Sequence, residues 1–214
     1  MESLETMRDH WWWRPGWRPG RSFYTWHITF DKHLNMVSLI DHYAEAVRRF
    51  PTLDEVGWSG LHTTIQGVGF SDEVSKSAVD NITEAARPYC ASIEPFTITV
   101  GPARVDPETV QMPALPVEPI VQLRQAIRKG IAAVWGDDNV PEEIEGFQPH
   151  VTLAYSNGPG SIGDIQSALD EVGPQTAIIA VSAISLIDLN RDRKRYEWHE
   201  IVRLPLGSED APRL

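Results

Sequence analysis

Two short segments of the chain share the pattern His-x-Thr-hydrophobic, and they carry the residue types best suited to catalysis. They are Leu61-His62-Thr63-Thr64-Ile65 and Pro149-His150-Val151-Thr152-Leu153. Because side chains alternate between the two faces of a β-strand, the histidine and the threonine of each segment point to the same face. Two such strands side by side would present two imidazoles and two hydroxyls to one groove. This set of groups predicts metal-free acid–base chemistry on a phosphate ester.

Histidine suits this chemistry because its unperturbed pKa of about 6.5 lets a neutral imidazole accept a proton while a protonated one donates. Hydrolysis of a phosphate ester needs a base for the attacking water and an acid for the departing oxygen. His62 and His150, on either side of phosphorus, would supply both, and the residue types leave open which one is the base. Thr64 and Thr152 would donate hydrogen bonds to the non-bridging oxygens as charge develops.

A metal centre is the alternative use for clustered histidines. Two histidines with two threonines form a poor set of metal ligands, and no carboxylate or cysteine stands at a characteristic spacing from them. We therefore expect no metal and no other cofactor.

A third His-x-Thr begins at His27, on an expected opening strand over residues 23–30. The alternation along that strand directs His27 away from the apolar face and toward the groove. Two interpretations stay open for it, a substrate contact or a satisfied surface histidine. Gln66 has the same parity as His62, so it is a second candidate for lining the groove.

The rest of the chain predicts the elements that position these motifs. Apolar residues recur every three or four positions over 36–50, 71–85, 118–134 and 161–172, which predicts four helices, with Ser71 as the N-cap of the second. Further strands are expected over 23–30, 96–105, 109–112, 177–189 and 196–204. Each half then has the order helix, His-x-Thr strand, helix, strand, strand, and this repeat makes His62 the counterpart of His150.

The expected fold class is therefore α+β, with two lobes related by a pseudo-twofold axis. Each lobe is a small, mainly antiparallel sheet backed by helices, and the two lobes enclose a central groove. We expect three regions: a Trp-rich N-terminal extension over 1–20, a single bilobal domain over 21–206, and a flexible tail over 207–214.

Composition limits the class of protein. The chain has 214 residues, of which 42% are hydrophobic, and this suits one globular domain. A net charge of -11 argues against a general nucleic-acid coat protein, which needs many basic phosphate contacts. The single cysteine, Cys90, excludes an intramolecular disulfide framework. No apolar run approaches the roughly 20 residues that span a bilayer, and the N-terminus lacks a signal sequence, so a cytoplasmic location is expected.

The extension contains half of the eight tryptophans and a tandem Trp-Arg-Pro-Gly, Trp13-Arg14-Pro15-Gly16-Trp17-Arg18-Pro19-Gly20. Its aromatic and basic side chains would stack on a base and contact phosphate, or its indoles would be buried against a lobe. Both interpretations stay open. The densest basic run, Arg191-Asp192-Arg193-Lys194-Arg195, predicts a solvated turn that would attract a phosphate if it overhangs the groove.

The chain resembles the 2H phosphoesterase superfamily, and within it the bacterial 2′-5′ RNA ligase-like and cyclic phosphodiesterase group. The resemblance rests on Leu61–Gly69, on Phe147–Leu153 and on the order of elements, and it covers about residues 21–206. It implies the bilobal fold and catalytic roles for the two His-x-Thr pairs. It also implies substrate contacts from Tyr196, with Arg191 and Arg195 as further candidates. Thr63 departs from the pattern, since relatives more often carry an apolar residue there.

The leading hypothesis is a metal-independent phosphodiesterase that acts on a 2′,3′-cyclic phosphate or a 2′-5′ linkage in a nucleotide or a short RNA end. One alternative is cleavage of a cyclic oligonucleotide signal with the same two histidines. Another is a non-catalytic nucleotide- or RNA-binding module on the same fold. The expected partner is the nucleotide or short RNA alone, with no membrane and no stable protein partner, so a monomer is expected.

Overall fold

The structure is a computed structural model, and it describes residues 5–30, 33–143 and 145–207. Its elements in chain order are β1 (Phe23–Thr29), α1 (Leu34–Arg48), β2 (Leu53–Glu55), η1 (Trp58–Gly60), β3 (His62–Phe70), α2 (Lys76–Ala91), β4 (Phe96–Val100), β5 (Arg104–Asp106), β6 (Thr109–Leu115), α3 (Val117–Trp135), η2 (Asp137–Asn139), β7 (His150–Ser156), α4 (Ile162–Val172), β8 (Ala177–Val181), β9 (Ala183–Asn190) and β10 (Glu197–Pro205). The tail expected over 207–214 lies, apart from residue 207, outside the described residues.

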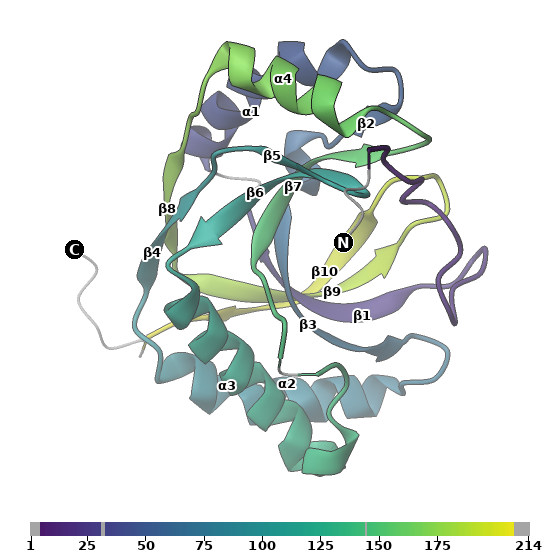
Figure 1. The fold of residues 1–214 in the computed structure, drawn as a ribbon. Helices are drawn as coiled ribbons and strands as arrows, with labels where there is room; N and C mark the ends of the chain where they lie inside the picture. Colours follow the sequence, from purple (N-terminus) through teal and green to yellow (C-terminus); the bar gives the residue numbers. More distant parts are fainter. Residues whose placement is uncertain (1–4, 31–32, 144, 208–214) are drawn as a thin grey trace.

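Two antiparallel sheets form the centre of the molecule. One has the strand order β10-β9-β1-β3, and the other has the order β2-β7-β6-β4-β8, with β5 paired to β6. Helices α2 and α3 pack together and cover the first sheet, whereas α1 and α4 pack together beside the second (Figure 1). The predicted α+β fold, two antiparallel sheets backed by helices, is therefore confirmed.

The two His-x-Thr strands, β3 and β7, lie next to each other where the two sheets meet (Figure 1). Thr63 and Ile65 of β3 are almost fully buried, as are Val151 and Leu153 of β7. These side chains form part of the core. The alternation expected for both segments therefore leaves each motif histidine and the threonine two residues later on the opposite face.

The strand pairing mixes the two halves of the chain. Strand β9 pairs with β1 from the beginning of the chain and with β10 on its other side, while β8 pairs with β4. Each sheet is thus built from strands of both halves. A repeat read from the order of elements cannot show this exchange, because strand pairing depends on contacts between residues far apart in the chain.

Several element boundaries also differ from those expected. The segment 96–105 forms two strands, because Gly101 adopts a φ of 104° and Pro102 lacks an N–H to donate. The segment 177–189 likewise divides into β8 and β9. Helix α2 begins at Lys76, and its N-cap is Ser75, whose hydroxyl accepts a hydrogen bond from Ala78 N at 3.2 Å. Strand β2 was not predicted.

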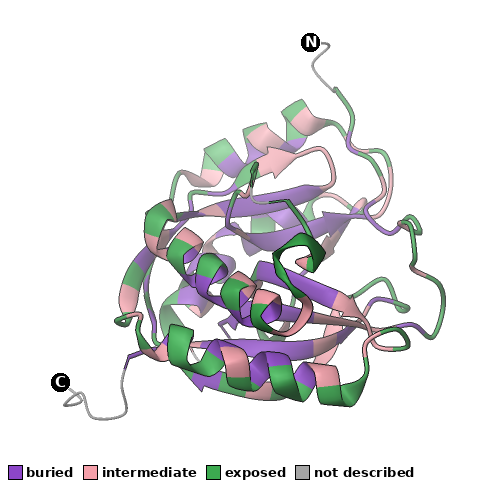
Figure 2. Ribbon diagram, turned by 90° about the horizontal axis from the view of Figure 1, so that it is seen from below, coloured by how far each residue is buried: buried purple, intermediate pink, exposed green. Residues whose placement is uncertain are grey.

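The core lies between the sheets and their helices. Buried residues occupy the strands and the inner faces of the helices, and exposed residues occupy the outer helix faces (Figure 2). Gly130 of α3 lets this helix approach α2 closely, since a Cβ there would come within 2.6 Å of the Ala86 Cβ. Within the described ranges, no helix is long and apolar enough to cross a membrane.

Candidate active site

The two His-x-Thr pairs line one pocket of about 310 Å³ between the sheets. His62 and Thr64 come from β3, and His150 and Thr152 come from β7. The two imidazoles and the two hydroxyls are thus brought to a single cavity, as the strand alternation predicts.

The two motif histidines make the same hydrogen bond. His62 donates from Nδ1 to the Gly60 carbonyl at 2.8 Å, and His150 donates from Nδ1 to the Gln148 carbonyl at 2.9 Å. A carbonyl oxygen only accepts, so the proton of each neutral ring sits on Nδ1. Within the described part of the chain, Nε2 of each ring has no hydrogen-bond partner, which leaves it available to take or give a proton in the pocket.

His62 is held in its neutral form. Burial lowers the pKa of His62 to about 4, the bond to the Gly60 carbonyl opposes this change, and the charge of His150 lowers the pKa further. At neutral pH the ring therefore has a free lone pair on Nε2, which is the state required of a general base.

His27 packs directly behind His62. The two rings are parallel within 3°, with their centroids 4.3 Å apart. His27 Nε2 lies 3.3 Å from Thr64 Oγ1, while its Nδ1 is buried without a hydrogen-bond partner among the described residues. A buried, unbonded N–H is costly, so we assign the proton to Nε2, which donates to Thr64. The Thr64 hydroxyl proton is then free to point into the pocket.

The position of His27 excludes one of its two interpretations, that of a surface histidine. The residue is 1% exposed and lines the pocket, so it is not a surface histidine. Burial lowers the pKa of His27 well below its usual value, and the neighbouring His62 adds to this effect. His27 is therefore a neutral ring that contacts both members of the first motif.

Gln66 does not line the pocket, and this corrects the expectation from its parity. In the pairing of β1 with β3, Trp26 faces Gln66 and His27 faces Thr64, so β3 has an extra residue between the two positions. This β-bulge interrupts the alternation of side chains. The fully buried Gln66 amide instead accepts hydrogen bonds from Arg124 Nε and Arg128 Nη1, at 3.2 and 3.1 Å.

Two arginines of the basic run, Arg191 and Arg195, were predicted to contact substrate, and they lie in different places. Arg191 is 3% exposed and lines the pocket beside Tyr196, so it is not part of a solvated turn. It donates from Nη2 to the His10 and Trp12 carbonyls at 2.9 and 3.2 Å. Arg195 is exposed, lies 3.9 Å from a Glu197 carboxylate oxygen and does not line this pocket.

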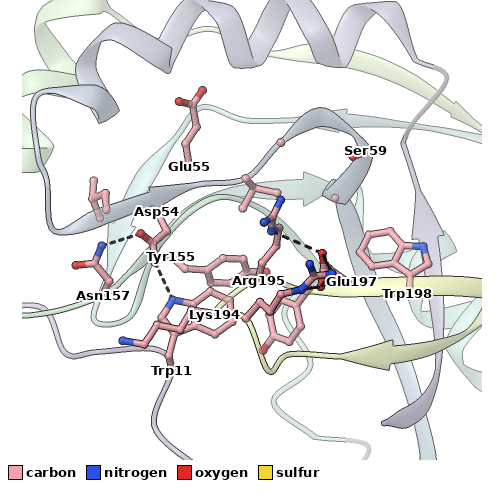
Figure 3. Close-up of a pocket in the computed structure, with 16 residues that line it drawn as sticks. Trp11, Asp54, Glu55, Ser59, Tyr155, Asn157, Lys194, Arg195, Glu197 and Trp198 are labelled. Atoms are coloured by element: carbon pink, nitrogen blue, oxygen red, sulfur yellow. Dashed lines mark hydrogen bonds and ion pairs between the residues drawn. The ribbon is translucent and has the colours of Figure 1, made fainter. Parts of the chain in front are cut away.

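A second, larger pocket of about 1100 Å³ adjoins the first, and Tyr155 and Tyr196 line both. Its rim includes Lys194 and Arg195 (Figure 3). Asp54, which also lines it, accepts hydrogen bonds from Trp11 Nε1 and from the Asn157 amide, at 3.0 and 2.7 Å (Figure 3).

The N-terminal segment supplies pocket residues that sequence reasoning missed. Residues 5–20, which we call the strap, run from the end of the second sheet to β1 (Figure 1). The strap places His10, Arg14 and Trp17 in the lining of the smaller pocket. The tandem repeat signalled Arg14 and Trp17, whereas nothing in the sequence singles out His10.

His10 joins the strap to the far wall of the pocket. Its Nε2 lies 2.9 Å from the Tyr196 hydroxyl, and its ring packs 4.3 Å from that of Tyr155. Burial, together with the charges of Arg14 and Arg191, lowers the pKa of His10 to about 3. Trp11 is buried beside it, which matches the packing interpretation, but Trp12 and Trp13 are 48% and 47% exposed.

Comparisons with known proteins agree with this architecture. A family model described as the 2′-5′ RNA ligase superfamily matches residues 36–193. No curated protein matches the sequence. Similar solved structures include TT0787 of Thermus thermophilus, with 17% identity, a TM-score of 0.69, and coverage of 87% of this chain and 99% of that one. They also include E. coli LigT complexed with 3′-AMP, with 17% identity, a TM-score of 0.60, and coverage of 87% and 98%.

Proposed function

The chain belongs to the 2′-5′ RNA ligase superfamily, within the 2H phosphoesterases, and from this membership we propose that it is a metal-independent phosphodiesterase. Its proposed substrates are 2′,3′-cyclic phosphates or 2′-5′ linkages of nucleotides or short RNA ends. The observation that carries the proposal is the matched pair of Nδ1–carbonyl bonds at His62 and His150. These bonds leave the Nε2 atoms of both rings available in one pocket, which supports their use as the acid and the base.

The lowered pKa of His62 supports one assignment of the base and acid roles, which the sequence leaves open. We assign His62 as the base and His150 as the acid for hydrolysis of a cyclic phosphate. His62 Nε2 takes a proton from water as the water oxygen bonds to phosphorus. The bond from phosphorus to one ribose oxygen breaks, and that oxygen takes a proton from Nε2 of His150, which enters this step as the imidazolium, protonated on both nitrogens. In the reverse reaction, which forms the bond between phosphorus and the ribose oxygen, the two histidines exchange the roles of base and acid.

The threonines complete the proposed site. Thr64 and Thr152 line the same pocket as the histidines, so their hydroxyls are available to donate to the non-bridging phosphate oxygens. Donors aimed at developing negative charge lower the barrier by electrostatic stabilisation. Among the described residues, no group of three or more His, Cys, Asp or Glu side chains is placed to hold a metal ion.

The size of the pocket supports a nucleotide as the substrate. A volume of about 310 Å³ lies at the lower end of the roughly 300–1,000 Å³ found for small-molecule sites. The similar E. coli LigT has been crystallised with 3′-AMP, with ATP and with NADP+. Nucleotides are therefore the first compounds to test on this chain.

The proposed function is tested by mass spectrometry of a pooled substrate set in excess chelator. The pool contains 2′,3′-cyclic mononucleotides, 2′-5′-linked dinucleotides and cyclic dinucleotides. We expect turnover of one of the first two classes, and we expect its loss in His62→Ala and in His150→Ala. His199→Ala is the matched control, since His199 is an exposed histidine on β10.

Three outcomes would contradict the proposal. Loss of turnover on chelation alone would point to a metal enzyme. Turnover of cyclic dinucleotides only would favour the alternative of a signal-degrading enzyme. Binding of nucleotides without any turnover by the wild-type protein would favour the non-catalytic module.

A further inference from the structure

The strap lies outside the segment that the family model matches, which begins at residue 36, yet it forms one wall of the pocket. Its backbone is fixed to the end of β7 and to the loop that follows it, where His10 N donates to the Ser156 carbonyl and Met7 N donates to the Gly160 carbonyl, both at 2.8 Å. Side chains on this wall are therefore held in place beside the histidines. They are candidates for contacts that belong to this chain in particular.

The two copies of Trp-Arg-Pro-Gly in the strap place their arginines differently. Arg14, from the first copy, lines the pocket. Arg18, from the second copy, is 67% exposed and donates to an Asp72 carboxylate oxygen at 2.9 Å on the surface. The same local sequence thus gives one arginine directed to the site and one that has no part in it, which makes Arg18 a matched control for Arg14.

Arg191 lies beside Arg14 in the pocket lining as a buried cation. Within the described ranges, no carboxylate oxygen lies within 4.0 Å of its guanidinium nitrogens, and its Nη2 alone is committed, to the two strap carbonyls. The rings of Trp11, Trp17 and Tyr196 lie 5.6, 5.7 and 5.9 Å from its guanidinium carbon. A buried charge without a counter-charge is costly, and an anion bound in the pocket would offset that cost.

The charges around this end of the pocket add to the argument. Glu108 accepts from Arg14 Nη2 at 2.7 Å and lies 3.6 Å from Arg8, so one carboxylate is shared between two guanidinium groups. The lining itself contains Arg14 and Arg191 but only one carboxylate, Glu142. In a protein with a net charge of -11, this local excess of positive charge is selective for an anion.

We propose that Arg14 and Arg191 form a second anion subsite, which binds a phosphate of the substrate other than the one that reacts. The inference rests on the proposed function and narrows the substrate class. The substrate is then a nucleotide that carries a 2′,3′-cyclic phosphate and, in addition, a phosphate on its 5′ side. That phosphate is either a terminal 5′-monophosphate or the next diester of a short RNA chain.

A kinetic comparison of three adenosine substrates tests the proposal. They are 2′,3′-cyclic AMP, the same compound with a 5′-monophosphate, and a dinucleotide that ends in the cyclic phosphate. We expect kcat/KM for at least one of the two substrates with a second phosphate to exceed that of 2′,3′-cyclic AMP by roughly tenfold or more, since a hydrogen bond to a charged group contributes at this level. Which of the two is preferred distinguishes the terminal phosphate from the diester.

Variants separate the subsite from a structural role of the strap. Arg14→Gln is expected to reduce the preference for a second phosphate by roughly tenfold while turnover of 2′,3′-cyclic AMP falls far less. Arg18→Gln is expected to keep the wild-type preference. Glu108→Gln removes the carboxylate that Arg14 and Arg8 share, and it is expected to raise the preference for a second phosphate. A variant that only loosened the strap would lower this preference. Equal kcat/KM for all three substrates, or an unchanged preference in Arg14→Gln, would overturn the proposal.

A binding measurement keeps the proposal separate from the proposed reaction. In the His62→Ala variant, calorimetry is expected to show 5′-AMP binding roughly tenfold or more tightly than adenosine, and this difference is expected to shrink in His62→Ala/Arg14→Gln. If the wild-type protein turns over no substrate but this difference is found, the phosphodiesterase proposal fails and the anion subsite stands. If 5′-AMP and adenosine bind equally, the subsite is refuted whatever the activity.

Discussion

At the scale of single residues, the site depends on which nitrogen of each histidine carries a proton. His62 and His150 each donate from Nδ1 to the carbonyl two residues earlier, so both present Nε2 to the pocket. His27 has the opposite tautomer, with Nε2 bonded to Thr64 and Nδ1 unbonded. We therefore propose two purposes for the three His-x-Thr segments: proton transfer for the segments of His62 and His150, and orientation of a neighbour for the segment of His27.

The pKa of His62 gives an expected pH dependence. Because that pKa is lowered to about 4, the His62 ring is mainly neutral above about pH 4 and mainly protonated below it. The acid limb of kcat/KM for 2′,3′-cyclic AMP is therefore expected near pH 4, not near the value of about 6.5 for an unperturbed histidine. A pH–rate profile in buffers of constant ionic strength measures it. An acid limb at pH 6 to 7 would contradict the assignment of His62 as the buried base.

His27 is expected to act as a positioning residue. His27→Phe keeps an aromatic ring against His62 but removes the donor to Thr64, so kcat is expected to fall roughly five- to tenfold, as for loss of one hydrogen bond. His27→Gln keeps a donor but removes the stacked ring, and the acid limb of its pH–rate profile is expected to move. His199→Phe, at an exposed site, is the control. Wild-type kcat and pH dependence in both His27 variants would remove this role.

At the scale of elements, alternation along the strands predicts the two His-x-Thr pairs in one pocket but fails for Gln66. Alternation is a local property, and it holds in β3 up to Thr64. Beyond this residue the bulge between β1 and β3 shifts the pattern, and a bulge depends on the partner strand. The placement of β9 and β10 in the same sheet as β1 and β3 could not be predicted either, because it also depends on contacts between strands far apart in the chain. The four amphipathic helices could be predicted, because their periodicity is local. Helix α2 began later than expected because Ser75, not Ser71, caps it.

The contact between α2 and α3 makes a clear stability prediction. Gly130→Val would place a Cβ 2.6 Å from the Ala86 Cβ, so the helices must separate, and overpacking of this kind costs about 1–3 kcal/mol. Chemical denaturation of both proteins measures the difference in free energy of unfolding. Gly163→Ala is the control, because no atom lies within 4 Å of its added Cβ and alanine favours helices. Equal loss of stability in both variants would show that the close approach is not the cause.

At the scale of the whole molecule, the two sheets and the strap enclose a site that no single part contains. The first sheet supplies His62 and Thr64, the second supplies His150 and Thr152, and the strap closes the wall with Arg14. The sequence indicated the four motif residues because their pattern is repeated. It did not indicate His10 as a pocket residue, since its position depends on the path of a segment without regular structure.

Three histidines with lowered pKa values give an expected dependence of stability on pH. His10, His27 and His62 are neutral in the folded protein, whereas in the unfolded chain they take up protons below about pH 6.5. The unfolded state therefore binds more protons, so the free energy of unfolding falls as the pH is lowered below 6.5, by up to about 1.4 kcal/mol per pH unit for each histidine.

Denaturant titrations between pH 7.5 and pH 5 measure this loss, above the range in which most carboxylates take up protons. His10→Gln, which removes one of the three groups, is expected to reduce the slope. The control is His199→Gln, at an exposed histidine, which is expected to leave the slope unchanged. A free energy of unfolding that is constant from pH 7.5 to pH 5 would contradict the neutral, buried state of these rings.

The most direct test of the acid–base pair is a double-variant comparison of kcat for 2′,3′-cyclic AMP in excess chelator. General acid and base groups contribute roughly 10²- to 10⁴-fold each, and groups that act as a unit are strongly non-additive. We therefore expect His62→Ala and His150→Ala each to lose at least about 100-fold, and His62→Ala/His150→Ala to lose little more than either single variant. Wild-type kcat in either single variant, or complete loss of wild-type activity on chelation, would contradict the proposed metal-free pair of histidines.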